Sequence, residues 1–214
     1  TLTELWEKRT LGRLTINDYT RLGGVKEALR KRANQIYESL STEEQLIAKQ
    51  IFLELTHLGE GTEDTRRQVR QEDLVTQRRS PKLVEKVIQH LAQERLIITS
   101  EQEFEGRRVA VVNIAHEALI RNWDLLREWL KENREALVVK QDIEEAARGW
   151  RNNRMSPDYL LIGQRLKIAE DFLSMDSQTI QLSQIALEFI KCSREARNPL
   201  KRTAARFRNI FNNN

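Results

Sequence analysis

The chain has 214 residues, with 36 Lys and Arg against 32 Asp and Glu, so its formal net charge is only +4. No apolar run approaches the roughly 20 residues that a membrane-spanning helix needs, which excludes an integral membrane protein of that kind. The single cysteine, Cys192, excludes an internal disulfide framework and fits a reducing compartment. The first residue is Thr1 and no signal-peptide pattern follows. We therefore expect a cytoplasmic piece of a longer protein.

Residues 1–40 are predicted to form short helices joined by a turn at Gly23-Gly24. Two apolar stripes at helical spacing support this prediction. The first consists of Leu2, Leu5 and Trp6, and the second of Val25, Leu29, Ala33, Ile36 and Tyr37.

The next helix has an unusually clear start. Ser41 is followed three residues later by Glu44, which is the signature of a capping box in which a hydroxyl and a carboxylate each satisfy one free backbone N–H. We expect this helix to end at Gly59. Its buried face is predicted to carry Ile47, Ile51, Leu55 and Leu58.

The pattern over residues 59–115 changes from loop to helix and then to strand. A polar loop at residues 59–65 precedes a short predicted strand at residues 67–69 and a brief helix around residues 72–75. Pro81 suits the first position of the following helix, since its missing N–H costs nothing there. Residues 96–99 and 108–114 are rich in β-branched side chains and flank a loop ending in Gly106, which predicts a hairpin. This order predicts a winged helix-turn-helix over residues 41–115.

Everything after Ala115 is predicted to be helical, so the fold class is mainly α. The first two of four apolar stripes run through Leu119, Trp123, Leu126 and Leu130, and through Val139, Ile143, Ala146 and Trp150. The last two run through Ile162, Leu166, Ala169 and Leu173, and through Leu182, Ile185, Ala186 and Phe189. Ser156-Pro157 is predicted to start the third of these helices, and the last begins near Thr179. Such stripes need partners, which favours a helical bundle or arm.

A family resemblance is carried by four pieces of sequence in a fixed order. They are residues 2–12 (LTELWEKRTLG), residues 13–24, residues 59–67 (GEGTEDTRR) and residues 115–130, with AHEALIRNW followed by LLREWL. Together they resemble the novel STAND NTPases, which are bacterial signal-transduction ATPases often followed by WD repeats. The resemblance covers roughly residues 1–175.

The resemblance implies a place within a larger protein. Residues 1–40 would be the end of the helical lid of the ATPase, 41–130 the winged-helix domain, 131–190 a helical arm, and 191–214 a basic tail or linker. The sequence has no G-x-x-x-x-G-K-[ST] phosphate-binding loop, so we do not expect the chain to be an enzyme or to hold a cofactor itself. ADP or ATP is expected in the full-length protein. The implied partners are an upstream ATPase module, downstream sensor repeats and other copies on activation.

His116 is the candidate nucleotide-binding residue. In related STAND proteins of the plant resistance and apoptotic type, a Met-His-Asp motif at this place lets the histidine reach the phosphates of ADP. Ala115-His116-Glu117 stands in for that motif here. An imidazole N–H near a helix N-terminus can donate to a phosphate oxygen. The alternative is that His116 caps its helix and bonds to the hairpin.

Other candidate sites have weaker patterns. Glu60, Glu63 and Asp64 lack the alternation of a calcium loop, and pairing of Arg66 or Arg67 with Glu63 or Asp64 is the simpler expectation. Glu117 and Arg121 are spaced for an ordinary helix ion pair. No two of the candidate zinc ligands lie at ligand spacing; these are His57, His90, His116 and Cys192. No motif of a catalytic nucleophile is present. Trp123, Trp129 and Trp150 are predicted to pack in the core.

The alternative function is a DNA-binding transcription regulator that uses the winged helix. The exposed face of the helix after Pro81 would offer Lys82, Lys86 and Gln89, but also Glu85. The hairpin loop carries Glu101, Glu103 and Glu105, which would repel phosphates. We therefore do not expect nucleic acid or a membrane as the partner. The basic tail fits a solvated linker, a surface for anionic lipid or nucleic acid, or the approach to a following domain.

Overall fold

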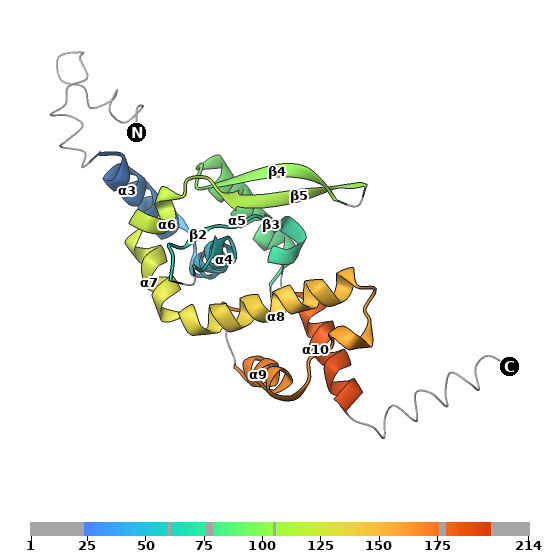
Figure 1. Cartoon of the computed structure of the whole chain (residues 1–214). Coiled ribbons are helices and arrows are strands. Elements are labelled where there is room, and N and C mark those ends of the chain that lie inside the picture. The colour runs from blue at the N-terminus through green and yellow to red at the C-terminus, as the bar shows by residue number, and fades with distance from the viewer. Residues whose placement is uncertain (1–23, 60, 76–78, 105, 176–178, 198–214) are drawn as a thin grey trace, which may run out of the picture. The chain divides into compact units, whose positions relative to one another are not determined.

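The computed structural model describes residues 24–59, 61–75, 79–104, 106–175 and 179–197. The predictions for the first lid helix, the Gly23 turn residue, Glu60, Glu105 and most of the basic tail lie outside these residues. The chain divides into two compact units, one ending at Arg134 and the other beginning at Glu135. The predicted mainly helical fold with a hairpin is confirmed, and Figure 1 labels its α-helices and most of its strands.

The first unit begins with two helices joined by a short connection. Helix α3 spans Gly24–Ser39 and buries Ala28, Ala33 and Ile36. Helix α4 spans Thr42–Glu54 and starts with the predicted capping box. The Ser41 N–H donates to the Glu44 carboxylate at 2.9 Å, and the Glu44 N–H donates to the Ser41 hydroxyl at 3.4 Å.

Helix α4 ends five residues earlier than predicted. Thr56–His57 (β1) leaves the helix and pairs antiparallel with Thr65–Arg66 (β2). The Thr56 hydroxyl donates to the Phe52 carbonyl at 2.8 Å, which satisfies one acceptor at the helix end. Leu55 and Leu58 are buried as expected, but Leu55 is the C-cap residue of α4 and Leu58 lies in the loop after β1. The apolar spacing continues beyond the last residue of α4. A prediction based on that spacing therefore placed the end of the helix too late.

The centre of the first unit is a helix packed beside a small sheet. Strand β3 (Val69–Arg70) leads into a 3₁₀ turn, η1 (Gln71–Leu74), and then into α5 (Pro81–Gln93), which starts at the predicted proline. Strands β4 (Ile97–Phe104) and β5 (Arg107–Ile114) form the predicted hairpin, longer than the sequence indicated. The sheet order is β3-β5-β4, and all pairs are antiparallel. The buried stripe of α5 is Val84, Val87, Ile88 and Leu91, while Leu83 is half-buried.

The first helix predicted after Ala115 is broken at Trp123. Helix α6 spans Ala118–Asn122 and α7 spans Asp124–Glu132. Trp123 has an extended backbone, its N–H donates to the Leu119 carbonyl at 2.9 Å, and its carbonyl accepts from the Arg127 N–H at 3.0 Å. One residue therefore closes α6 and opens α7. The predicted core positions Leu119, Trp123, Leu126 and Leu130 are nevertheless all buried.

The second unit is helical throughout its described residues. It contains α8 (Arg134–Asn152) from Glu135 onward, the 3₁₀ turn η2 (Pro157–Tyr159), α9 (Gly163–Ser174) and α10 (Gln184–Arg197). Trp150 of α8 packs against Phe189 of α10, with ring centroids 5.4 Å apart. The Glu144 carboxylate accepts from the N–H and the hydroxyl of Ser183, both at 2.6 Å, just before α10 begins.

Three predictions for this unit were wrong, and one of them is the start of the last helix, since α10 begins at Gln184 and not near Thr179. Ser156-Pro157 starts η2 instead of α9, and α9 begins only at Gly163, which has a positive φ of 54°. The buried stripe of α9 is therefore Leu166, Ala169 and Phe172, with Leu173 half-buried. The predicted core residue Ile162 is 79% exposed.

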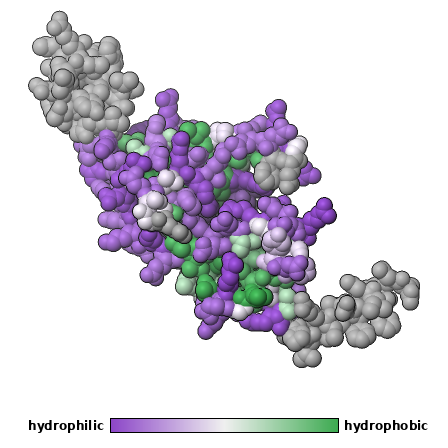
Figure 2. All heavy atoms as spheres, in the orientation of Figure 1, coloured by the Kyte–Doolittle hydropathy of each residue, from purple (hydrophilic) through white to green (hydrophobic). Residues whose placement is uncertain are grey.

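The surface of the second unit carries several apolar side chains. Figure 2 shows hydrophobic residues exposed on this part of the chain. Its exposed large hydrophobics are Val138, Met155, Tyr159, Ile162, Ile168 and Met175. No helix among the described residues is long and apolar enough to cross a membrane.

The capping box gives a first prediction about pH. The Lys86 ammonium, donating at 2.8 Å, and the Ser41 N–H and hydroxyl together lower the pKa of Glu44 from 4.5 to about 2. Because the folded-state pKa is the lower one, this stabilisation is present above pH 4.5 and is lost as pH falls towards 2. We expect Glu44→Gln to lower the melting temperature at pH 6 and to have a much smaller effect near pH 2. Thermal unfolding followed by circular dichroism measures this convergence. A constant difference across the range would contradict the assignment, and Glu43→Gln, on the exposed side of α4, is the matched control.

Candidate functional site

His116 lies between the end of β5 at Ile114 and the start of α6 at Ala118. Its side chain is exposed and forms no hydrogen bond with any residue that the structure describes. The start of α6 has no side-chain cap, and the His116 carbonyl accepts from the Leu119 N–H at 2.9 Å. The imidazole therefore neither caps the helix nor bonds to the hairpin.

The polar loop at residues 59–65 is held by arginines from distant parts of the sequence. Arg134, 70 residues from Asp64, donates from Nη1 to both oxygens of its carboxylate at 3.2 Å and from Nη2 to the Gly59 carbonyl at 2.8 Å. Asp64 also accepts from the Gly59 N–H at 3.0 Å. Arg121 pairs with Glu63 at 2.8 Å and with Glu117 at 3.7 Å, so the predicted helix pair is present.

This pairing corrects the prediction for the loop. Arg67 does not bind Glu63 or Asp64 but lies 3.5 Å from Glu54 of α4. No group of three potential metal ligands occurs in the described part of the chain, and the Glu63 and Asp64 carboxylates are neutralised by arginine. The loop is thus a structural connection between α4, α6 and the start of α8.

Gly59 is required where this loop begins. A Cβ atom at this position would lie 2.4 Å from the Thr62 carbonyl oxygen, which is closer than such atoms approach each other. The tight turn lets the loop lie against α6 and α7. Between them is an open cleft of about 720 Å³. Its lining includes Glu63, Asp64, Ile120, Arg121, Asp124, Arg127, Leu130, Lys131 and Arg134.

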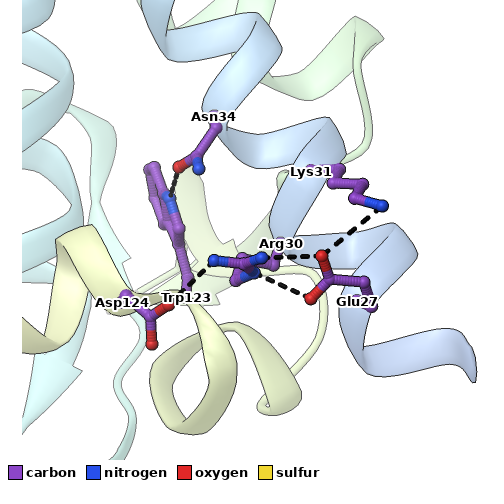
Figure 3. A network of polar contacts seen from close by, with 6 residues as sticks. All are labelled: Glu27, Arg30, Lys31, Asn34, Trp123 and Asp124. Carbon is purple, nitrogen blue, oxygen red and sulfur yellow. Dashed lines mark hydrogen bonds and ion pairs between the residues drawn. The ribbon is translucent and has the colours of Figure 1, made fainter. Parts of the chain in front are cut away.

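Trp123 connects the break between α6 and α7 to helix α3 (Figure 3). Its indole N–H donates to the Asn34 side-chain oxygen at 2.6 Å. Beside it, Arg30 donates to Asp124 at 3.1 Å and to both carboxylate oxygens of Glu27 at 2.9 and 2.6 Å. The hydrogen bonds from Arg30 lower the pKa of Glu27, and in return Glu27 raises the pKa of Arg30.

The same tryptophan is the centre of an aromatic cluster made of Tyr37, Phe52, Trp123 and Trp129. The ring centroids of Trp123 lie 4.9 Å from Phe52, 5.4 Å from Trp129 and 6.3 Å from Tyr37. Burial among these rings raises the pKa of the Tyr37 hydroxyl. The cluster joins α3, α4 and α7, and the core positions predicted for Trp123, Trp129 and Trp150 are confirmed.

The remaining candidates lie apart from this site. The Cys192 thiol is half-buried on α10, and burial raises its pKa, which favours the unreactive protonated form. On the helix that would read DNA, Lys86 is engaged with Glu44 at 2.8 Å. On the hairpin, Arg108 lies 3.7 Å from Glu101.

The described residues therefore define a mainly helical protein region that joins a charged loop, a hairpin and helices α3, α6 and α7. Its sequence contains no phosphate-binding loop. The chain belongs to the Novel STAND NTPase 1 family, whose model matches residues 1–158. The resemblance identified from the sequence is thereby confirmed. The search of curated proteins found no match, and neither did the search of solved structures.

Several contacts of this site, and the helix break at Trp123, could not be predicted from the sequence. Asn34 and Arg134 belong to no motif that we identified, and each acts on a partner 70 or more residues away. Arg30 and Asp124 are 94 residues apart. Within the family motif at residues 115–130, the break at Trp123 was hidden because the apolar spacing continues through it.

Proposed function

We propose that this chain is the non-catalytic regulatory portion of a STAND-type signalling NTPase. In this proposal, residues 41–130 form a winged helix that packs on an ATPase module elsewhere in the protein. The helices after residue 130 form an arm towards C-terminal sensor repeats. The observation that carries the proposal is the family match over residues 1–158 combined with the absence of a phosphate-binding loop from the sequence.

The element order supports the winged-helix interpretation. Helix α4, strand β3, the 3₁₀ turn η1, helix α5 and the β4–β5 hairpin occur in this order, with the short β1–β2 pair between α4 and β3. This order supports a helix, strand, turn, helix and wing. Helix α3 precedes them and packs on the same unit. The wing ends at Ile114, and the candidate sensor residue His116 follows it in the connection to α6.

His116 is proposed to donate a hydrogen bond to a phosphate of bound ADP. Its exposed imidazole has no competing partner among the described residues. An imidazole donor to a phosphate oxygen is a charge-assisted hydrogen bond, and it would tie the winged helix to the nucleotide-bound state. Release of the phosphate would then free the β5–α6 segment to move.

The contacts around α6 connect it to other elements, so a movement of α6 would be transmitted to them. Arg121 links α6 to the loop through Glu63, and Arg134 links the loop to the beginning of α8. Trp123 and Asp124 link the α6–α7 break to α3 through Asn34 and Arg30. A displacement at His116 thus acts on discrete hydrogen bonds and ion pairs in two directions, towards α3 and towards α8.

The test uses the longer protein that contains the ATPase module. We expect His116→Ala to speed dissociation of a fluorescent ADP analogue by about ten- to a hundredfold, the effect of removing one hydrogen bond to a charged group. Stopped-flow fluorescence measures the rate. His57→Ala is the matched control because His57 is also exposed and lies in β1.

An unchanged dissociation rate for His116→Ala would contradict the sensor role. The DNA-binding alternative is separated by titrating the chain with duplex DNA at 50 and 200 mM salt. A regulator that neutralises several phosphates loses affinity steeply over this range. Tight and strongly salt-dependent binding would favour that alternative over the proposal.

A further inference from the structure

The three-stranded sheet is incomplete on one side of β5. Strand β5 has eight residues and pairs with β4 along its whole length. On its other side, β3 pairs only with Val111 and Val112 before the chain enters η1, which remains in contact with β5 but forms no strand. The position beside Arg107–Ala110 is therefore not occupied by any strand in the described part of the chain.

The register of the hairpin determines which backbone groups face this open side. The Ala115 N–H donates to the Leu96 carbonyl at 3.0 Å, so these two residues occupy a hydrogen-bonded position of the ladder, although the Leu96 N–H itself donates to the Leu91 carbonyl. Such pairs alternate along an antiparallel ladder. The N–H groups of Arg108 and Ala110 consequently point away from β4, and no described residue accepts a hydrogen bond from either.

A groove of about 380 Å³ lies beside these backbone groups. Its apolar lining comes from α5, from β5 and from Val75, which is 37% exposed. The apolar residues are Val75, Pro81, Val84, Ile88, Val109 and Ala110. Its polar lining is formed by Gln71, Glu72, Glu85 and Arg108.

The charges of this polar lining are not balanced. Arg108 lies 3.7 Å from Glu101, and Glu72 lies 3.4 Å from Arg70. Glu85 accepts a hydrogen bond from Gln89 at 3.4 Å but meets no cation among the described residues. The Glu85 carboxylate is therefore available to pair with a cationic group of a ligand in the groove.

We propose that this groove binds an extended, basic peptide segment as an additional strand on β5. The backbone carbonyls of the segment would accept from the Arg108 and Ala110 N–H groups, an apolar side chain would cover the exposed Val75 and the half-buried Val109, and a lysine or arginine would reach Glu85. Main-chain hydrogen bonds with pockets for alternate side chains are the mode of β-strand addition. This binding surface goes beyond the proposed regulatory role.

The test is a titration of the ¹⁵N-labelled 214-residue chain with a seven-residue peptide of alternating valine and lysine. We expect the amide protons of Arg108 and Ala110 to move downfield, as hydrogen-bonded strand amides do, and their exchange with solvent to slow. Two control peptides define the mode. One is N-methylated at every residue so that it cannot extend a sheet, and the other has glutamate in place of lysine.

Protein variants make the test specific. Ala110→Pro removes an N–H that the β4 ladder does not use, so the hairpin remains and peptide affinity should fall at least about tenfold. Glu85→Lys should weaken binding of the lysine peptide and strengthen binding of the glutamate peptide. Glu128→Lys, which is exposed on α7, is the matched control and should change neither.

Three results would overturn the proposal. The first is the absence of shifts at Arg108 and Ala110 at millimolar lysine peptide. The second is equal binding of the N-methylated peptide. The third is a Glu85→Lys variant whose preference between the two charged peptides is the same as that of the unmodified chain.

Discussion

Replacing Trp123 with alanine is expected to lower the free energy of unfolding by about 3–5 kcal/mol, the usual cost of truncating a buried large aromatic side chain. Trp123 is 1% exposed and contacts three other rings of the aromatic cluster. Its loss also leaves the Asn34 side-chain oxygen without the indole donor. Urea unfolding followed by far-UV circular dichroism measures the effect.

Trp123→Phe separates the two contributions. Phenylalanine keeps much of the ring packing but cannot donate to Asn34, so we expect a smaller loss of about 1–3 kcal/mol, the cost of leaving a part-buried acceptor unpaired and of shortening the side chain. Trp123→Ala within about 0.5 kcal/mol of the unmodified chain would mean that the cluster does not stabilise the first unit. Such a result would also remove the proposed connection between α3 and the α6–α7 break.

Replacing Phe189 with alanine is expected to destabilise the second unit by about 3–5 kcal/mol. Phe189 is fully buried on α10 and packs against Trp150 of α8. Hydrogen–deuterium exchange measures the effect by element: amides of α9 and α10 should exchange faster, while those of α4 and α5 should keep their protection. The residues of α4 and α5 belong to the other unit.

Tyr159→Ala is the matched control for this prediction. Tyr159 lies in the same unit but is 49% exposed, so its truncation should change stability by no more than about 0.5 kcal/mol. Equal exchange in both units after Phe189→Ala would show that they unfold as one cooperative structure, contrary to the expectation.

Local signals in the sequence were sufficient for most of the element starts. The capping box at Ser41 and Glu44 and the proline at the start of α5 both occur as predicted. The hairpin was also predicted, since its β-branched residues and Gly106 lie within about 20 residues of each other. Each of these features depends on residues that are neighbours along the chain, and for that reason the pattern could be interpreted without the fold.

Element ends and register depended on contacts that no local pattern contains. Helix α4 stops at Glu54 because Thr56 pairs with Arg66 across the loop. The α6–α7 helix breaks at Trp123, whose indole meets Asn34. In both cases the apolar periodicity continues past the break, because buried residues are needed there whatever the backbone conformation.

The sequence by itself determined the family, the helical class, the hairpin and the position of His116 at its end, because caps, periodicity and motif order are properties of nearby residues. Only the tertiary structure decided that Arg134 holds Asp64, that Arg30 and Asn34 hold the α6–α7 break, and that β5 has an open side. Those features come from side chains and strands brought together over 70 or more residues, or from where a short strand ends. Their partners are selected by packing and hydrogen-bond geometry in three dimensions, which spacing along the chain does not specify.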